Sequence, residues 1–299
     1  MNLKAVTYAA YGGPDVLKLH DVPVPEPSRG QVRVRVRAAA VNPADCKIRS
    51  GAWGTTRPLP AIPGLDVAGV VDAVGPDAEF VIGDKVFGHA VGGSYAEYAL
   101  ASTVAIKPAE LDWDSAVAIP TSGAAALRAL NLLDLTAGRT LLVNGAAGCV
   151  GTFAVQLALR EGITVIGTSS PTHHDSLRQL GVIPTTYGDG LIERVGALAP
   201  LGIDAALDAA GRGFWRAALK LGTPPQQIVT LVDGEAEQAG ITYSTKAHHS
   251  AAQLSELAAL VAVGELVLPP PRRFPLSDAA AAHEASEHGH GRGKIVINS

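Results

Sequence analysis

Cysteine is scarce in this sequence: its 299 residues include only two, Cys46 and Cys149. Two cysteines in unrelated contexts cannot form a disulfide framework, which favours a reducing compartment. The opening stretch MNLKAVTYAAYGG lacks the basic and long apolar regions of a secretory signal. No unbroken apolar run reaches the roughly 18 residues that a membrane-spanning helix needs. The sequence therefore predicts a cytoplasmic protein without a membrane segment.

Strong charge of one sign is also missing. The formal net charge is −4 and the basic residues form no block, so the sequence carries no electrostatic footprint for nucleic acid. Glycine, by contrast, is abundant, with 33 residues, and 47% of the chain is hydrophobic. This composition is typical of an α/β protein with a large core and many tight turns. A prior of roughly 150 residues per domain then predicts two domains.

The N-terminal part reads as short strands separated by glycine and proline. In QVRVRVRAAAV, at 31–41, valines alternate with arginines, which predicts a half-buried strand with Val32, Val34 and Val36 on one face. The segments LDVAGVVDAVG, DKVFGHA and GSYAEYALA add further short strands with glycine between them. We expect a β-rich domain over residues 1–118.

Beyond residue 118, strands alternate with helices such as VGTFAVQLALREG. The buried strands expected here lie at 139–145, 163–169, 182–188, 203–211 and 226–233. This rhythm predicts a doubly wound parallel sheet over residues 119–264, and a helix near 251–263 is expected to close it. The tail 265–299 then supplies a helix and a last strand, which we expect to return to the first domain.

The stretch NGAAGCVG, at 144–151, follows one predicted strand and opens a predicted helix. Its glycines allow a tight turn and a close approach of the backbone to a pyrophosphate, and the N–H groups at the helix start attract an anion. A tight turn without a ligand is the alternative, but the strand–turn–helix context favours a dinucleotide. At Cys149 the backbone N–H is expected to contribute, not the sulfur. The predicted contacts in this turn are Gly145, Ala147, Gly148, Cys149, Val150 and Gly151.

The end of the second strand of this domain indicates which dinucleotide is bound. A site that prefers NAD carries an acidic residue about 20 residues after the glycines, but Thr168, Ser169 and Ser170 stand there instead. Hydroxyl groups can donate hydrogen bonds to a 2′-phosphate and, unlike a carboxylate, do not repel it. His174 adds a partly protonated group nearby. Ser170 also reads as a helix cap before a proline, and the two roles are compatible. We therefore predict NADPH.

Four motifs in one order carry a family resemblance. AAAVNPADCKIRSG and PGLDVAGVVDAVG precede AAGCVG, and GRGKIVI follows near the end. The chain resembles the medium-chain dehydrogenase/reductase superfamily, in its zinc-free quinone oxidoreductase (zeta-crystallin-like) branch. The resemblance implies a GroES-like β-rich substrate domain, residues 1–118 completed by 265–299, and a Rossmann NADPH-binding domain, residues 119–264. It also implies a homodimer.

The same resemblance bears on metal binding. Zinc-dependent members carry a ligand cysteine where this chain has Asn42, and a His–Glu pair where it has Leu65 and Asp66. Leucine cannot ligate and an amide is a poor substitute for a thiolate, so we expect no metal. The histidine clusters at 173–174, 248–249 and 288–290 read as exposed surface. Asp66 then becomes a polar anchor, expected to pair with Lys47 or Arg49.

The resemblance also implies the residues around the reacting groups. Asn42 corresponds to an asparagine that lines the nicotinamide pocket, and Lys47 stands where several relatives have a tyrosine near the substrate. A solvated surface lysine is the alternative for Lys47. At the carboxyl ends of the later strands, the expected cofactor contacts are Tyr187, Ala209, Ala210, Leu231 and Val232, the last two being equally compatible with core packing. A hydroxyl that the family often carries near Ala125 is absent.

Without a metal to polarise an alcohol or ketone, a bound hydride donor suits acceptors that are already electrophilic. The sequence thus predicts an NADPH-dependent reductase of small-molecule quinones or α,β-unsaturated carbonyl compounds. Two alternatives stay open: an enoyl-thioester reductase of the fatty-acid or polyketide type, and an NADPH-binding protein with little turnover. The predicted pocket residues are compatible with each of these functions.

Overall fold

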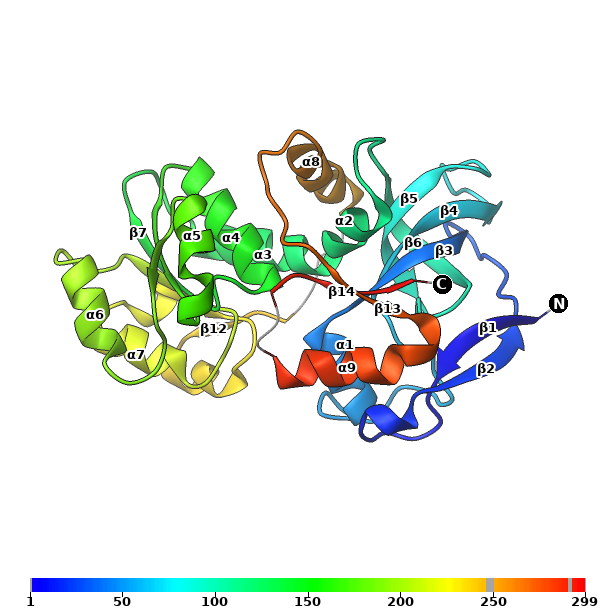
Figure 1. Ribbon diagram of the computed structural model, residues 1–299, viewed down its shortest axis with the longest axis horizontal. Coiled ribbons are helices and arrows are strands. Elements are labelled where there is room, and N and C mark those ends of the chain that lie inside the picture. The colour runs from blue at the N-terminus through cyan, green and yellow to red at the C-terminus, as the bar shows by residue number, and fades with distance from the viewer. Residues whose placement is uncertain (1, 246–249, 290–291, 299) are drawn as a thin grey trace. The chain divides into compact units, whose positions relative to one another are not determined.

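A computed structural model describes residues 2–245, 250–289 and 292–298, so that His248, His249 and His290 of the predicted histidine clusters lie outside the described residues. The chain divides into two compact units (Figure 1). Unit 1 consists of Met1–Thr121 and His249–Ser299, and unit 2 of Ser122–His248. Within the described residues, no helix is both long and apolar enough to cross a bilayer.

The main sheet of unit 1 has six strands in the order β13-β14-β3-β4-β5-β6, and β3 also pairs with β6. Because β3 pairs with both β4 and β6, the four strands β3, β4, β5 and β6 form a closed barrel without a free edge between them. The strands of unit 1 are β1 Asn2–Thr7, β2 Lys18–Pro23, β3 Val32–Val41, β4 Asp66–Val74, β5 Lys85–Val91, β6 Tyr98–Ile106, β13 Arg272–Pro275 and β14 Ile295–Asn298. The helices are α1 Pro43–Ser50, α2 Trp113–Ala118, α8 Ala251–Ala262 and α9 Ala279–His288.

The alternating pattern of β3 is realised as expected. Val32, Val34 and Val36 are buried in the core of unit 1, whereas Arg35 and Arg37 are exposed. One face of the strand therefore supplies the barrel interior and the other meets solvent.

The tail returns to unit 1 through β14, which pairs antiparallel with β3 and places Ile295 opposite Val41. The helix α8 differs from our expectation that it would close the nucleotide domain: it packs against β6 of unit 1. Its apolar side chains Leu254, Leu257 and Ala258 are buried there. An amphipathic helix needs an apolar surface, but its own sequence does not say which sheet provides it.

Unit 2 contains a fully parallel six-stranded sheet in the order β12-β11-β10-β7-β8-β9. Its strands are β7 Thr140–Asn144, β8 Thr164–Thr168, β9 Ile183–Thr185, β10 Ala205–Asp208, β11 Ile228–Thr230 and β12 Thr242–Tyr243. The helices are α3 Pro120–Leu133, whose first two residues belong to unit 1, and α4 Cys149–Arg160, α5 His174–Gln179, α6 Leu191–Leu198 and α7 Phe214–Lys220. The chain order reverses at β7, between β10 and β8, and ligands of such sheets bind at the carboxyl ends of the strands at this point.

Candidate functional site

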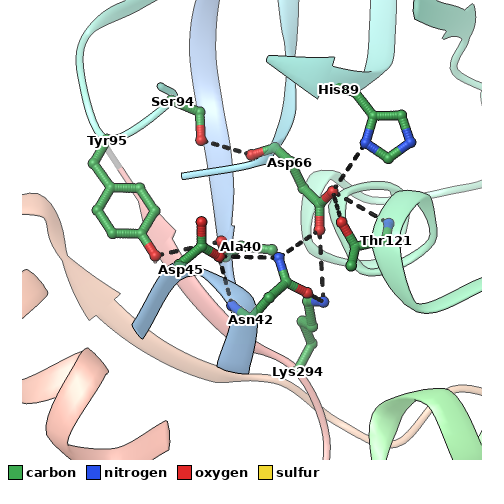
Figure 2. Close-up of polar contacts among 9 residues, drawn as sticks. All are labelled: Ala40, Asn42, Asp45, Asp66, His89, Ser94, Tyr95, Thr121 and Lys294. Atoms are coloured by element: carbon green, nitrogen blue, oxygen red, sulfur yellow. Dashed lines mark hydrogen bonds and ion pairs between the residues drawn. The ribbon is translucent and has the colours of Figure 1, made fainter. Parts of the chain in front are cut away.

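The first candidate site is a buried polar cluster in unit 1, centred on Asp66 at the start of β4 (Figure 2). One carboxylate oxygen, Oδ1, accepts hydrogen bonds from Thr121 Oγ1 at 2.6 Å and from Thr121 N at 3.2 Å, and lies 3.5 Å from His89 Nδ1. The other oxygen accepts from Asn42 Nδ2 at 3.0 Å and lies 3.6 Å from Lys294 Nζ. Groups from four separate segments thus converge on one carboxylate.

These contacts explain how a fully buried carboxylate stays charged. Burial alone raises the pKa of Asp66, but the hydrogen bond from His89 and the positive charge of Lys294 outweigh it and hold the pKa below the usual value. A buried charge is tolerated when it is paired and hydrogen-bonded in this way. Asp66 is therefore a structural anchor that joins β4 to the surrounding elements.

A second buried carboxylate, Asp45, lies beside the first. Its Oδ2 accepts from Asn42 N at 2.8 Å and from Asn42 Nδ2 at 3.1 Å, which completes a capping box at the start of α1. Burial, followed by the negative charge of Asp66, raises the pKa of Asp45 to about 7. The two carboxyl groups therefore differ in charge state near neutral pH, although they share the same amide donor.

The Asn42 side chain is held from both ends. Its Nδ2 donates to Asp45 and Asp66, while its Oδ1 accepts from Lys294 Nζ at 2.5 Å. Two carboxyl groups at one end and an ammonium at the other determine which way the amide points. Both amide protons are used within the protein, so a ligand meets only the remaining acceptor capacity of Oδ1.

The prediction that Asp66 pairs with Lys47 or Arg49 was wrong. Lys47 stacks on Trp53, with Nζ 5.2 Å from the ring centroid. Arg49 is buried and pairs with Glu287 on α9 at 2.5 Å. The pairing with Lys294 replaces both, because β14 runs beside β3 and brings a residue 252 positions from Asn42 into the cluster.

Cys46 does not form a reactive site. Burial raises the pKa of its thiol to about 12, and its Sγ lies 3.8 Å from the carbonyl oxygen of His283. Burial, together with the nearby positive charge of Arg49, lowers the pKa of His283 to about 3. Both groups stay neutral and help to attach α9 to α1.

The second candidate site is the glycine-rich turn between β7 and α4 in unit 2. Gly145 has a φ of 79°, which favours glycine, and Gly148 is the N-cap residue of α4. A Cβ atom on Gly151 would lie 2.1 Å from the carbonyl oxygen of Gly145, so the helix start packs directly on the turn. The N–H groups of a first helical turn have no intrahelical acceptor and attract anions. The turn therefore fits a pyrophosphate.

The turn is held by a hydrogen-bond network of three buried side chains, those of Asn144, Thr168 and Asp208. Asn144 Nδ2 donates to Asp208 Oδ1 at 2.8 Å, and Thr168 Oγ1 donates to Asn144 Oδ1 at 2.7 Å. The Thr168 hydroxyl also accepts from Gly145 N at 3.2 Å, and Asp208 Oδ1 accepts from the N–H of Gly211 at 2.7 Å. Thr168, predicted as a cofactor contact, is fully buried and holds the turn instead of facing a ligand.

The other predicted cofactor residues fall into different environments. Ser169 is buried, and the Ser170 hydroxyl bonds to Thr172 Oγ1, without capping the short helix that follows. His174 starts α5 with its Nε2 buried and without a hydrogen-bond partner. Exposure varies among the rest: Tyr187 and Ala210 are exposed, whereas Ala209, Leu231 and Val232 are half-buried. Tyr187 lies two residues beyond the end of β9.

Sequence reasoning missed several of the residues that build these sites. In unit 1 they are Lys294, His89, Thr121 and Asp45, and in unit 2 they are Asn144 and Asp208. Each lies within or next to a segment that was singled out, for example Lys294 in GRGKIVI. A lysine that opens an apolar strand was the available signal, because such a lysine is buried only with a partner.

Comparisons with known proteins extend over both units. Residues 28–110 match a family model described as alcohol dehydrogenase GroES-like domain, and residues 186–297 match one described as zinc-binding dehydrogenase. Human quinone oxidoreductase is 33% identical over 322 residues, covering 99% of this chain and 97% of that protein. The chloroplastic NADPH-dependent alkenal/one oxidoreductase of Arabidopsis thaliana is 33% identical, covering 99% and 79%. The quinone oxidoreductase structure from Coxiella burnetii has 33% identity and a TM-score of 0.89 over 100% of both chains.

The description of the second family model raises the question of zinc. Within the described ranges, no three His, Cys, Asp or Glu side chains gather closely enough to hold a metal ion. In the Asp66 cluster, the position next to the carboxylates is taken by the Lys294 ammonium, which repels a cation. Leu65 offers no donor atom. The donor set around Asp66 therefore does not fit zinc.

Proposed function

Because this chain belongs to the medium-chain dehydrogenase/reductase superfamily, in its quinone oxidoreductase branch, we propose that it is an NADPH-dependent oxidoreductase of quinones and α,β-unsaturated carbonyl compounds. The names of two relatives that match 99% of the chain, a quinone oxidoreductase and an NADPH-dependent alkenal/one oxidoreductase, support this substrate class. Both kinds of acceptor take a hydride at an electrophilic carbon or ring without metal assistance.

The single observation that carries the proposal is the geometry of the turn at 144–151. Gly145 adopts a positive φ, and Gly151 packs so closely on its carbonyl oxygen that no side chain fits between them. The first turn of α4 then presents backbone N–H groups at the carboxyl end of β7, where the strand order reverses. NADPH, when bound, supplies the hydride, and the turn binds its pyrophosphate.

The choice of NADPH over NADH is supported by the residues that follow β8. Ser169 and Ser170 occupy the place of the acidic residue that would repel a 2′-phosphate. The one acidic residue close by, Asp175, lies inside α5 and pairs with Arg178 at 2.6 Å. His174 begins the same helix, but its unpartnered Nε2 is buried, so the support from this loop comes from the two serines.

In unit 1, we assign positioning to Asn42 and a secondary role to Lys47. Because both protons of the Asn42 amide are committed to carboxylates, it would meet the nicotinamide through Oδ1 only. The Lys47 ammonium, stacked on Trp53, would stabilise negative charge that develops on the substrate oxygen. The homodimer and the cytoplasmic location stay predictions from the sequence.

The test is an assay of NADPH oxidation with four acceptors: 9,10-phenanthrenequinone, 1,4-benzoquinone, an alkenal and a crotonyl thioester. We expect turnover with the quinones and the alkenal. Turnover with the crotonyl thioester alone would favour an enoyl-thioester reductase. Tight NADPH binding without turnover of any acceptor would contradict the proposal and favour a binding protein.

A further inference from the structure

The loop after β10 carries an arginine with an unusual backbone conformation. Arg212 has a φ of 61°, between Gly211 at 76° and Gly213 at 66°. A residue with a Cβ atom adopts this region infrequently and at a cost in free energy. Arg212 is exposed, and its guanidinium carbon lies 5.7 Å from the centroid of the Tyr187 ring. This conformation therefore belongs to a specific cation–π contact between two loops.

The two loops that meet in this contact come from strands that are not neighbours. Tyr187 follows β9 and Arg212 follows β10, and the sheet order places β8 and β7 between them. Three strand spacings amount to about 14 Å. All four strands are parallel, so both loops leave the same edge of the sheet. The contact between Arg212 and Tyr187 therefore crosses above the carboxyl ends of β7 and β8, where the glycine turn and Ser169 begin.

The loop that carries Tyr187 is fixed in place. Arg194 donates to the carbonyl oxygens of Thr186 at 2.9 Å and Asp189 at 2.8 Å. The N–H of Ser169 donates to the carbonyl oxygen of Thr185 at 3.0 Å, which ties the end of β8 to the end of β9. The aromatic ring thus has a defined place next to the end of β8 before any ligand binds.

The loop after β8 supplies hydroxyl groups but no cation of fixed charge. From Thr168 through Leu177 the sequence has no lysine or arginine, although His174 contributes a buried ring nitrogen without a partner. A phosphate monoester carries nearly two negative charges, and a guanidinium binds two of its oxygens at once. The next arginine along the chain, Arg178, pairs with Asp175, whereas Arg212, which lies on a loop that reaches across, stacks on Tyr187.

We propose that Arg212 recognises the 2′-phosphate of NADPH, with Tyr187 as its aromatic support, so that the loop after β10 determines the choice between NADPH and NADH. This inference rests on the proposed binding of a dinucleotide and adds the residue that recognises its 2′-phosphate. It also accounts for a phosphate-preferring loop after β8 that lacks an arginine of its own.

The experiment is calorimetric titration of the full chain with NADPH, NADH and 2′,5′-ADP, a probe that has the 2′-phosphate without the nicotinamide. For Arg212→Ala we expect binding of NADPH and 2′,5′-ADP to weaken by about ten- to a hundredfold, the range for one charge-assisted hydrogen-bonded group, with NADH nearly unchanged. Arg212→Gly, which accepts the positive φ, should give the same result and excludes a rearranged loop as its cause.

A matched control is Arg216→Ala, four residues further on. Arg216 is also exposed and stacks on an aromatic ring, that of Trp215, at 4.1 Å, and it pairs with Glu235. All three affinities should stay as in the wild type. Tyr187→Phe should also preserve them, whereas Tyr187→Ala should weaken NADPH and 2′,5′-ADP less than Arg212→Ala does.

Three results would count against the inference. Unchanged NADPH binding by Arg212→Ala would overturn it while leaving the proposed function intact. Equal losses for NADPH and NADH would assign Arg212 to the part that the two nucleotides share, and would also overturn it. A wild-type chain that binds no dinucleotide would refute the proposed function, and the inference with it.

Discussion

The polar centres of the two units are built in opposite ways. In unit 2, one continuous stretch, 144–151, presents backbone groups, and the neutral side chains of Asn144 and Thr168 support it together with Asp208. In unit 1, the buried Asp66 carboxylate on β4 meets Lys294, before β14, and polar side chains from the N-cap of α1, from β5 and from the start of α3. The first design depends on backbone shape and the second on charge balance.

This difference determines how each centre fails. A backbone cradle is sensitive above all to added volume. A buried charge cluster tolerates little change in charge, because each ion relies on its partners to offset the loss of water. The two centres should therefore respond to different substitutions.

The largest expected effect is that of Asp66→Asn on the free energy of unfolding. The substitution keeps the shape but leaves Lys294 and His89 without their carboxylate, and breaking a buried pair costs about 3–5 kcal/mol. Denaturant unfolding measures the loss. The control is Asp21→Asn, which removes an exposed partner of Lys4 and should cost less than about 1 kcal/mol. Equal costs for the two variants would contradict the charge-balance account.

The next effect tests the backbone design. In Gly151→Ala the new Cβ atom meets the Gly145 carbonyl oxygen, and overpacking of this kind costs about 1–3 kcal/mol. We expect NADPH affinity, measured by fluorescence titration, to fall by roughly tenfold or more, as that cost implies. Gly196→Ala in α6 is the matched control, because its Cβ would enter open space, and it should leave affinity unchanged. Wild-type affinity in Gly151→Ala would refute the close packing.

The third prediction concerns pH. Burial raises the pKa of Asp45 to about 7, so between about pH 4 and pH 7 the folded chain keeps a proton that the unfolded chain has released. Stability from this group is therefore lost as pH rises through that window, by at most about 1.4 kcal/mol per pH unit. Asp45→Asn should remove this slope, so that its stability relative to wild type increases from pH 4 to pH 7 in urea unfolding.

An oppositely shifted carboxylate serves as the control for Asp45. Asp112, the N-cap residue of α2, accepts hydrogen bonds from Ser115, and although burial opposes the shift, these bonds lower its pKa. Its contribution to stability is present above the unfolded pKa of about 4 and lost below it. Asp112→Asn should therefore leave the pH 4 to pH 7 slope as in wild type. The same slope in Asp45→Asn as in wild type would mean that Asp45 is charged throughout.

The smallest effect is expected for Lys47→Ala. Lys47 contacts Trp53 and does not belong to the charge cluster that holds Asp66, so its loss leaves the fold intact. A single electrostatic contact of a half-buried lysine is expected to contribute about 1 kcal/mol, which corresponds to less than tenfold in kcat/KM with 9,10-phenanthrenequinone. A hundredfold loss in kcat with unchanged KM would contradict the secondary role proposed for Lys47 and give it a principal one.

The same contrast explains which features the sequence could predict. The turn at 144–151 and the strand at 31–41 are local, and periodicity and glycine spacing were sufficient to place both. The partners of Asp66 could not be predicted, because pairing of β14 with β3 brings Lys294 in from the far end of the sequence. For Thr168, the position was predicted but the role was not, since burial under the turn depends on neighbouring strands. The packing of α8 on β6 is equally non-local.

The return of the tail to unit 1 has a consequence for the order of events on the ribosome. Synthesis proceeds from the N-terminus, and domains usually fold in that order. Here β3 cannot pair with β14, and Asp66 cannot pair with Lys294, until all of unit 2 has been synthesised. Unit 2, although second along the chain, has its complete set of strands first. Of the two units, the one whose synthesis begins first is thus finished last, and Asp66 lacks its lysine throughout that interval.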